Sequence, residues 1–217
     1  MRDAGDADGL WFLVVANSAI FILFAFSFAK PQSNRDWRSL GAFSAFIIAL
    51  FTEMYGFPLT IYFLSGWLQR QVPQLDVFSH GAGHLWHTLF GLEGDAHLDV
   101  FHIASDVLIV LGFFLLAGAW RVLHAAQESR QLATDGVYAY VRHPQYVAFM
   151  LIMFGFLLQW PTLPTLVMFP ILLSVYVRLA NHEERDALNV FGDAYREYMR
   201  RTPKFNPRFS RRSGQPG

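Results

Sequence analysis

Long, predominantly apolar stretches are the feature that most constrains how this chain folds. Residues Leu10 to Ala29 contain no ionisable side chain and are long enough, as a helix, to cross a hydrocarbon core of roughly 30 Å. Similar apolar stretches follow at about 40–68, 100–122 and 146–180. Because lipid offers the backbone no hydrogen-bond partners, such a segment crosses a membrane as a helix. The sequence therefore predicts an all-α integral membrane protein.

Two proline-containing breaks set the expected number of spans. Gly56-Phe57-Pro58 interrupts the second stretch, and we expect a kink there because proline removes a helix hydrogen bond. Pro161-Thr162-Leu163-Pro164 divides the fourth stretch into a helical hairpin with little external loop. The expectation is about five transmembrane helices.

Composition agrees with the membrane class and argues against others. Of the 217 residues, 53% are hydrophobic and only 16% are charged, which is too apolar for an ordinary soluble domain. The formal net charge is zero, so no basic excess points to nucleic acid as a partner. Cysteine is absent, which removes disulfides, thiolate nucleophiles and thiolate metal ligands.

Lys and Arg predict the orientation, because these residues accumulate in cytoplasmic loops. The segments 30–38, 121–142 and 178–217 hold 15 of the 17 Lys and Arg residues. If these segments are cytoplasmic, the N-terminus lies outside and the C-terminus inside. Within His182–Arg201, apolar residues recur at helical spacing and predict a C-terminal amphipathic cytoplasmic helix: Leu188, Phe191, Tyr195 and Tyr198.

Ionisable residues gather at both edges of the fourth apolar stretch. Arg142-His143 precedes it and Glu183-Glu184 follows it. An isolated Arg-His pair at a membrane boundary is ordinarily a topogenic feature near lipid headgroups. Here two carboxylates stand at the other end of the same hairpin, and ionisable groups at membrane depth are costly unless a site uses them. The combination favours a binding site.

Several short motifs occur in order between about residues 130 and 208: Gly136-x-Tyr138, Arg142-His143-Pro144-x-Tyr146, Glu183-Glu184, Phe191-Gly192-x-x-Tyr195-x-x-Tyr198 and Thr202-Pro203-x-x-x-Pro207. Together they resemble the C-terminal signature of the isoprenylcysteine carboxyl methyltransferase family and related membrane phospholipid methyltransferases. The resemblance implies a helical membrane enzyme that binds S-adenosyl-L-methionine at its cytoplasmic side and takes a lipophilic acceptor sideways from the bilayer. It places these residues around the cofactor: Tyr138, Arg142, His143, Pro144, Tyr146, Glu183, Glu184 and Tyr195.

On this resemblance the chain is one membrane domain over 1–217. Region 130–208 binds the cofactor, and the three-span region 10–122, which carries no family signature, is the acceptor side. The acceptor is a small or lipid-like molecule, and its reacting group (carboxylate, thiol or amine) stays open.

The residue types suit this cofactor. The Arg142 guanidinium presents a planar fork of donors for the cofactor carboxylate. Glu183 or Glu184 suits the ammonium or ribose hydroxyls, and aromatic rings suit adenine and the sulfonium methyl. Adjacent helix residues point about 100° apart, so we expect only one glutamate, Glu184, to face the pocket. His143 either acts as a base or shapes the pocket, and Arg142, His143 and Glu184 form the expected catalytic set.

Two carboxylates within predicted spans, Glu53 and Asp106, have two interpretations. They face the acceptor cavity and select its polar group, or each is protonated or bonded to a neighbouring helix. His102 precedes Asp106 by one helical turn, so the two residues are also placed to satisfy each other.

Three histidines in the external loop, His80, His84 and His87, have the spacing i, i+4, i+7. A helix would bring them together around a metal ion. Histidines in polar loops are more often solvated, and the family named above uses no catalytic metal that matches this spacing. We therefore predict no metal site.

Other functions stay open beside the methyltransferase. Sterol reductases, which use NAD(P)H, resemble the same region but typically have asparagine before the motif tyrosine and Gly-Glu soon after. This chain has Gln145 before Tyr146 and Val147-Ala148 after it, and the methyltransferase pattern usually has glycine at the place of Ala148. A membrane scaffold or transporter without catalysis is the third alternative.

Overall fold

A computed structural model of the chain describes residues 10–29, 34–71, 73 and 83–207. These residues contain no β-strand, which confirms the all-α prediction for the described part of the chain. The helices are α1 (Trp11–Ala29), α2 (Asn34–Tyr55), α3 (Leu59–Gln71), α4 (Leu85–Leu89), η2 (Ala96–Leu98), α5 (Val100–Glu128), η3 (Gly136–Ala139), α6 (Pro144–Gln159), α7 (Leu163–Phe191) and α8 (Asp193–Arg201).

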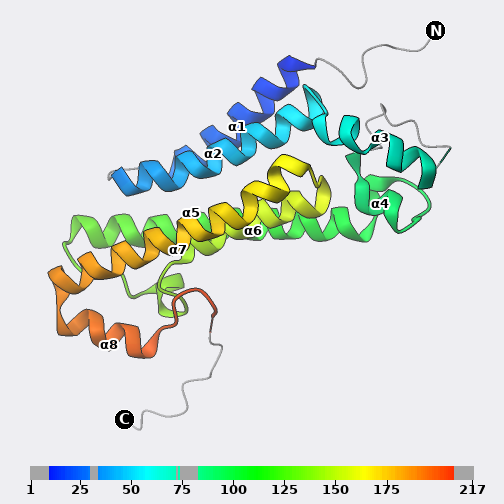
Figure 1. Ribbon diagram of the computed structural model, residues 1–217. Helices are drawn as coiled ribbons and strands as arrows, with labels where there is room; N and C mark the ends of the chain where they lie inside the picture. Colours follow the sequence, from blue (N-terminus) through cyan, green and yellow to red (C-terminus); the bar gives the residue numbers. More distant parts are fainter. Residues whose placement is uncertain (1–9, 30–33, 72, 74–82, 208–217) are drawn as a thin grey trace.

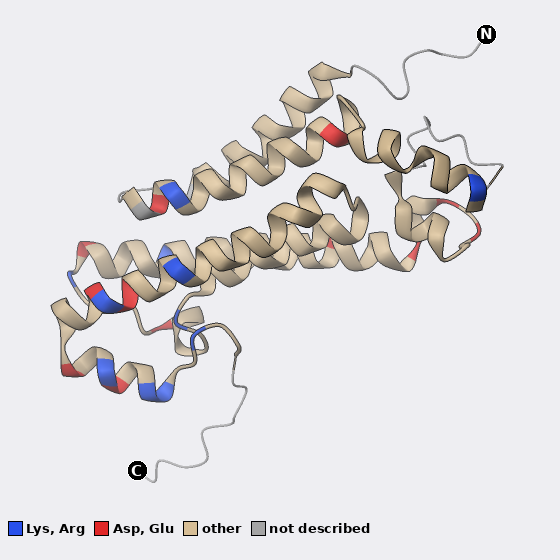
Figure 2. Cartoon of the chain, in the orientation of Figure 1, with Lys and Arg blue, Asp and Glu red and all other residues tan. Residues whose placement is uncertain are grey.

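The long helices run side by side and bring distant segments of the chain to one end. Helices α5, α6 and α7 lie together, and the α1–α2 pair packs along them (Figure 1). The start of α2, the end of α5, the start of α6 and the end of α7 all point toward the end where α8 lies (Figure 1). Figure 2 shows Lys and Arg concentrated at this end. We call it the α8 end.

The apolar helices support a membrane protein. By length and composition, α5 and α7 can each cross a membrane, and the bent α2–α3 pair is a third candidate if it counts as one span. The apolar segments of α1 and α6 are shorter. Only 28% of the apolar window of α5 and 22% of that of α7 is buried within the protein, so much of their apolar surface needs another cover, which lipid supplies. The predicted count of five spans is not confirmed.

The break between α2 and α3 confirms the kink predicted at Pro58. The two helices are bent by 50° across residues 56–58. The Thr60 backbone N–H, just after the break, donates to Glu53 Oε2 at 3.0 Å, and the Glu53 side chain is buried. Glu53 therefore satisfies a backbone donor that the break leaves without a helical partner.

The C-terminal helix is shorter than predicted. Helix α7 continues without interruption through residues 182–191, and α8 begins only at Asp193. Gly192 separates the two with a φ of 53°, a conformation that glycine adopts at little cost. The change from apolar to polar residues near His182 is therefore an exit from the apolar layer and not the end of a helix.

Small residues set the contact between α5 and α6. A Cβ on Gly112 would lie 2.6 Å from Ile152 Cγ1 and 3.2 Å from the carbonyl oxygen of Ala148. A Cβ on Gly155 would lie 2.8 Å from Ile109 Cγ1. Ala148, which stands where the family pattern has glycine, is fully buried at this contact. The extra methyl group is thus accommodated opposite a glycine of α5.

This contact predicts opposite effects for two glycines of the same helix. Gly112→Ala should destabilise the protein by about 1–3 kcal/mol, because the added methyl overpacks a buried contact. Gly118→Ala is the matched control, since its Cβ would meet only Val137 Cγ1 at 3.7 Å. It should stabilise the helix by up to about 1 kcal/mol. Thermal unfolding in detergent measures both, and a stable Gly112→Ala variant would contradict the close packing.

Candidate active site

A cavity of about 550 Å³ lies at the α8 end. Its walls come from α2, the end of α5, the segment 130–145, the end of α7, and α8. The predicted site residues that line it are Tyr138, Arg142, His143, Glu183 and Tyr195. Three further predicted residues, Pro144, Tyr146 and Glu184, do not line it. The structure thus divides the motif residues into two layers: one layer lines the cavity, and the other does not.

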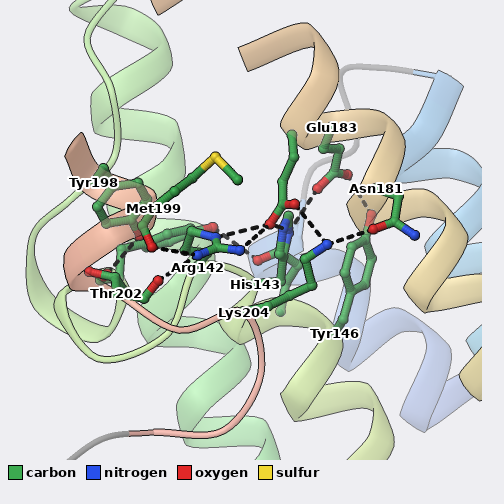
Figure 3. A network of polar contacts seen from close by, with 12 residues as sticks. Arg142, His143, Tyr146, Asn181, Glu183, Tyr198, Met199, Thr202 and Lys204 are labelled. Carbon is green, nitrogen blue, oxygen red and sulfur yellow. Dashed lines mark hydrogen bonds and ion pairs between the residues drawn. The ribbon is translucent and has the colours of Figure 1, made fainter. Parts of the chain in front are cut away.

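Arg142 holds three segments together (Figure 3). Its Nε donates to Glu184 Oε1 of α7 at 2.9 Å, and its Nη2 lies 2.8 Å from the same oxygen. Its Nη1 donates to the carbonyl oxygens of Met199 and Thr202, at 3.1 and 2.6 Å, which closes the C-terminal end of α8. The backbone N–H of Arg142 also donates to the carbonyl of Pro203 at 2.9 Å. All three guanidinium nitrogens are therefore engaged by protein acceptors.

Glu184 lies behind the cavity wall. Besides Arg142, its carboxylate accepts from Lys204 Nζ at 2.7 Å and lies 3.2 Å from His143 Nε2. The expectation that one glutamate of the pair faces the pocket is met, but the residue that lines the cavity is Glu183. Arg142 and Lys204, which belong to segments far apart in the sequence, both approach the side of α7 that carries Glu184.

Glu183 is held in a fixed orientation at the cavity wall. Tyr146 Oη donates to its Oε1 at 2.5 Å. His143 Nδ1 lies 3.2 Å from its Oε2, within ion-pair distance although not aligned for a hydrogen bond. The His143 ring is therefore placed between the two glutamates, with one nitrogen facing each (Figure 3).

The electrostatic surroundings favour a protonated His143. Burial by itself lowers the pKa of the imidazole, but the contacts with Glu183 and Glu184 outweigh it and raise that pKa above the usual value. A protonated histidine has no lone pair with which to accept a proton. Of the two roles considered for His143, a base or a residue that shapes the pocket, the geometry thus favours the second.

Three tyrosines give the cavity an ordered aromatic wall: Tyr138, Tyr195 and Tyr198. Tyr138 Oη donates to Gln145 Oε1 at 3.1 Å, and its carbonyl accepts from Tyr198 Oη at 2.7 Å. Burial raises the pKa of the Tyr138 hydroxyl well above its ordinary value, so this group stays neutral. It acts as a donor and not as a base.

The other predicted candidates lie away from the cavity. Glu53 is on α2 at the break, and Asp106 is exposed on α5. His102 does not meet Asp106, because its Nε2 contacts the Gln159 amide of α6 at 2.8 Å. The interpretation that His102 and Asp106 satisfy each other is therefore wrong.

In the described part of the chain, the external histidines are not arranged as the triad that a helix would form. His80 lies outside the described residues. His87 Nδ1 lies 3.0 Å from Asp99, whereas the His84 ring packs edge-on against Trp160. Among the residues that the structure describes, no group of three His, Asp or Glu side chains is arranged to hold a metal ion.

Sequence reasoning missed several residues of the site. Asp36, Arg130 and Asp186 line the cavity but belong to none of the motifs. Lys204 stands inside the Thr202–Pro207 motif at a position that the motif leaves free. Asp186 follows Glu183 by three residues on a helix, so spacing alone places it on the same face. The other three depend on long-range packing.

Comparison with known proteins agrees with the motif analysis. The model of the isoprenylcysteine carboxyl methyltransferase family matches residues 98–189. Over this segment the chain is similar to that family. The match starts earlier than the motifs and ends before α8, so it covers α5, α6 and nearly all of α7. It contains both halves of the Arg142–Glu184 pair.

A curated relative carries the same family name. The protein-S-isoprenylcysteine O-methyltransferase of Schizosaccharomyces pombe is 36% identical over 77 residues, which are 35% of this chain and 33% of the relative. The chain thus matches about a third of the length of this curated relative. No solved structure matches the chain.

The ion-pair network predicts a strong effect at Glu184. Glu184→Ala leaves the buried Arg142 without its carboxylate, which should cost about 3–5 kcal/mol of stability. Lys204→Ala is the control, because it removes a more exposed partner of the same carboxylate and should cost about 1 kcal/mol or less. Thermal unfolding and limited proteolysis near α8 measure the difference. Equal losses would show that Arg142 does not depend on Glu184.

His143 predicts a pH-dependent contribution to stability. Its pKa is raised in the folded protein, so its stabilising effect is complete below the unfolded value of about 6.5 and is lost as pH rises through the folded value. The melting temperature of wild type minus that of His143→Gln should therefore decrease from pH 6 to pH 9. A difference that stays constant would mean that the imidazole is neutral throughout.

Proposed function

We propose that this chain is an integral membrane methyltransferase that uses S-adenosyl-L-methionine to methylate a small or lipophilic acceptor. The observation that carries the proposal is the cavity at the α8 end. Its lining includes Tyr138, Arg142, His143 and Glu183, and all four lie in the segment that matches the model of the methyltransferase family. A volume of about 550 Å³ is within the range of small-molecule sites.

The charges of the cavity fit this methyl donor. Three carboxylates line it, Asp36, Glu183 and Asp186, together with one further cation, Arg130. The Arg142 charge is compensated by Glu184 behind the wall. A ligand with a sulfonium, an ammonium and one carboxylate has an excess of positive charge, which complements these walls. NADPH carries several phosphate charges, which the same carboxylates would repel.

The chemistry needs alignment more than proton transfer. Bound S-adenosyl-L-methionine supplies an electrophilic methyl group, and the acceptor atom bonds to it in line as the bond to sulfur breaks. Glu183, held by Tyr146 and His143, fixes the polar groups of the donor. The tyrosine wall orients the adenine and sulfonium. Such positioning lowers the barrier without a general base when the acceptor is already an anion.

The relative's name supports a carboxylate as that acceptor. Protein-S-isoprenylcysteine O-methyltransferase, by its name, methylates oxygen. A carboxylate is ionised at neutral pH and needs no base, which agrees with a protonated His143. We propose that the region 10–122 selects the lipophilic part of the acceptor, and that the α8 end faces the cytoplasm with the N-terminus outside.

Binding measurements test the proposal. Purified protein in detergent should bind S-adenosyl-L-methionine and not NADPH in calorimetric titrations. Glu183→Gln removes the charge at the cavity wall but keeps the shape, and it should weaken binding about 10–100-fold. Glu197→Gln is the matched control, because Glu197 is on α8 but does not line the cavity. It should leave affinity unchanged.

The acceptor is tested next, by transfer of a labelled methyl group to lipophilic carboxylates, thiols and amines in mixed micelles. A prenylated cysteine with a free carboxylate and its amide form a matched pair. Methylation of the acid alone supports O-methyl transfer. Binding of NADPH without S-adenosyl-L-methionine would overturn the proposal in favour of a reductase, and binding of neither would favour a scaffold or transporter.

A further inference from the structure

On the sequence alone, the carboxylate of the methyl donor is assigned to Arg142, but in the structure the Arg142 guanidinium is already bound by protein acceptors. The guanidinium binds Glu184 and two carbonyls at the end of α8, and its side chain is only 9% exposed. Redirecting it toward a ligand would uncap α8 and leave Glu184 with only Lys204 and His143 as partners. A carboxylate in this cavity therefore needs another cation.

Arg130 is a second arginine in the wall of the same cavity. Its side chain is exposed, and it makes no ion pair or side-chain hydrogen bond with any residue that the structure describes. The other ionisable side chains in the lining, apart from the tyrosines, are Asp36, Glu183, Asp186, Arg142 and His143. Arg142 and His143 are both paired with glutamates, so Arg130 is the cation of the described lining that no described residue compensates.

The backbone of Arg130 is unusual for this residue type. Arg130 follows the end of α5 and has a φ of 52°, and among the described residues it is the one non-glycine residue with a positive φ. The N–H groups of Arg130 and Gln131 close the helix on the carbonyls of Gln127 and Ala126. Helices commonly end in this way with glycine at the left-handed position, where a side chain is unfavourable.

A purely structural role for the Arg130 side chain does not explain why an arginine occupies this left-handed position. A cation near a helix C-terminus interacts favourably with the helix dipole. An arginine within the last turn of α5, in ordinary helical conformation, would have the same benefit without the strain. The left-handed residue instead lies just after the end of α5, at a position that lines the cavity.

We propose that Arg130 binds the carboxylate of the methyl donor. This assignment rests on the proposed function and deepens it. Arg130 supplies the planar pair of donors that a carboxylate prefers. Glu183, which lines the same cavity, supplies the opposite charge for the ammonium of the same amino-acid group. Arg142 then has a positioning role, because it orders α8 and Glu184 behind the site.

The test compares two ligands that differ only in the carboxylate. S-adenosylhomocysteine carries it, and S-adenosyl-3-thiopropylamine lacks it. Calorimetric titration of both ligands into wild type, Arg130→Gly, Arg130→Lys and Arg196→Ala gives the ratio of the two affinities for each protein. Arg196→Ala is the control for loss of an exposed cation at the α8 end, since Arg196 pairs with Asp193 and does not line the cavity.

Wild type should bind S-adenosylhomocysteine at least tenfold more tightly than the analogue. Arg130→Gly should reduce this ratio to about one while its affinity for the analogue stays unchanged, and Arg130→Lys should retain part of the ratio. The melting temperature of Arg130→Gly should equal or exceed that of wild type, because glycine relieves the left-handed strain. A residue with a merely structural role would change both affinities together.

Two outcomes overturn the assignment in distinguishable ways. If wild type binds S-adenosylhomocysteine and Arg130→Gly keeps the wild-type ratio, Arg130 does not bind the carboxylate, and the proposed function stands. If wild type binds neither ligand, the proposed function fails and the assignment fails with it.

Discussion

The buried ion pair between Arg142 and Glu184 is the interaction on which the rest of the α8 end depends. Each side chain is only 9% exposed, so each charge would be costly without the other. The remaining donors of Arg142 bind carbonyls of α8, and the remaining carboxylate oxygen of Glu184 binds Lys204. One pair thus joins α7 to the loop before α6 and to the segment after α8. The cavity exists because these segments stay together.

A sequence predicts such a site only as far as its parts are local. The apolar stretches, the break at Pro58 and the clustering of Arg142, His143, Glu183 and Tyr138 were all predictable, because each depends on composition or on a motif. The motif did not reveal which glutamate faces the cavity. That choice depends on Arg142 and Lys204 approaching one side of α7, and both approach through long-range packing.

The sequence is also a poor guide to where α7 ends and to what His102 contacts, and in both cases local patterns do not determine the outcome. The change in polarity near His182 suggested a helix boundary, but hydrogen bonding continues through a polarity change, and the chain breaks only at Gly192. Spacing on one helix allows His102 to contact Asp106, yet the His102 ring meets Gln159 on α6. Periodicity predicts which residues share a helix face, and the neighbouring helix then decides what each one contacts.

The cavity is lined both by the segment that matches the family model and by a part of the chain outside that match. Asn34 and Asp36 of α2 line the cavity, although the family match begins only at residue 98. Tyr176 of α7 donates to the Ser39 carbonyl at 3.3 Å, which fixes the start of α2 against the helix that carries Glu183. Substitutions in α2 therefore alter the shape and charge of the cavity without any change in the motif residues.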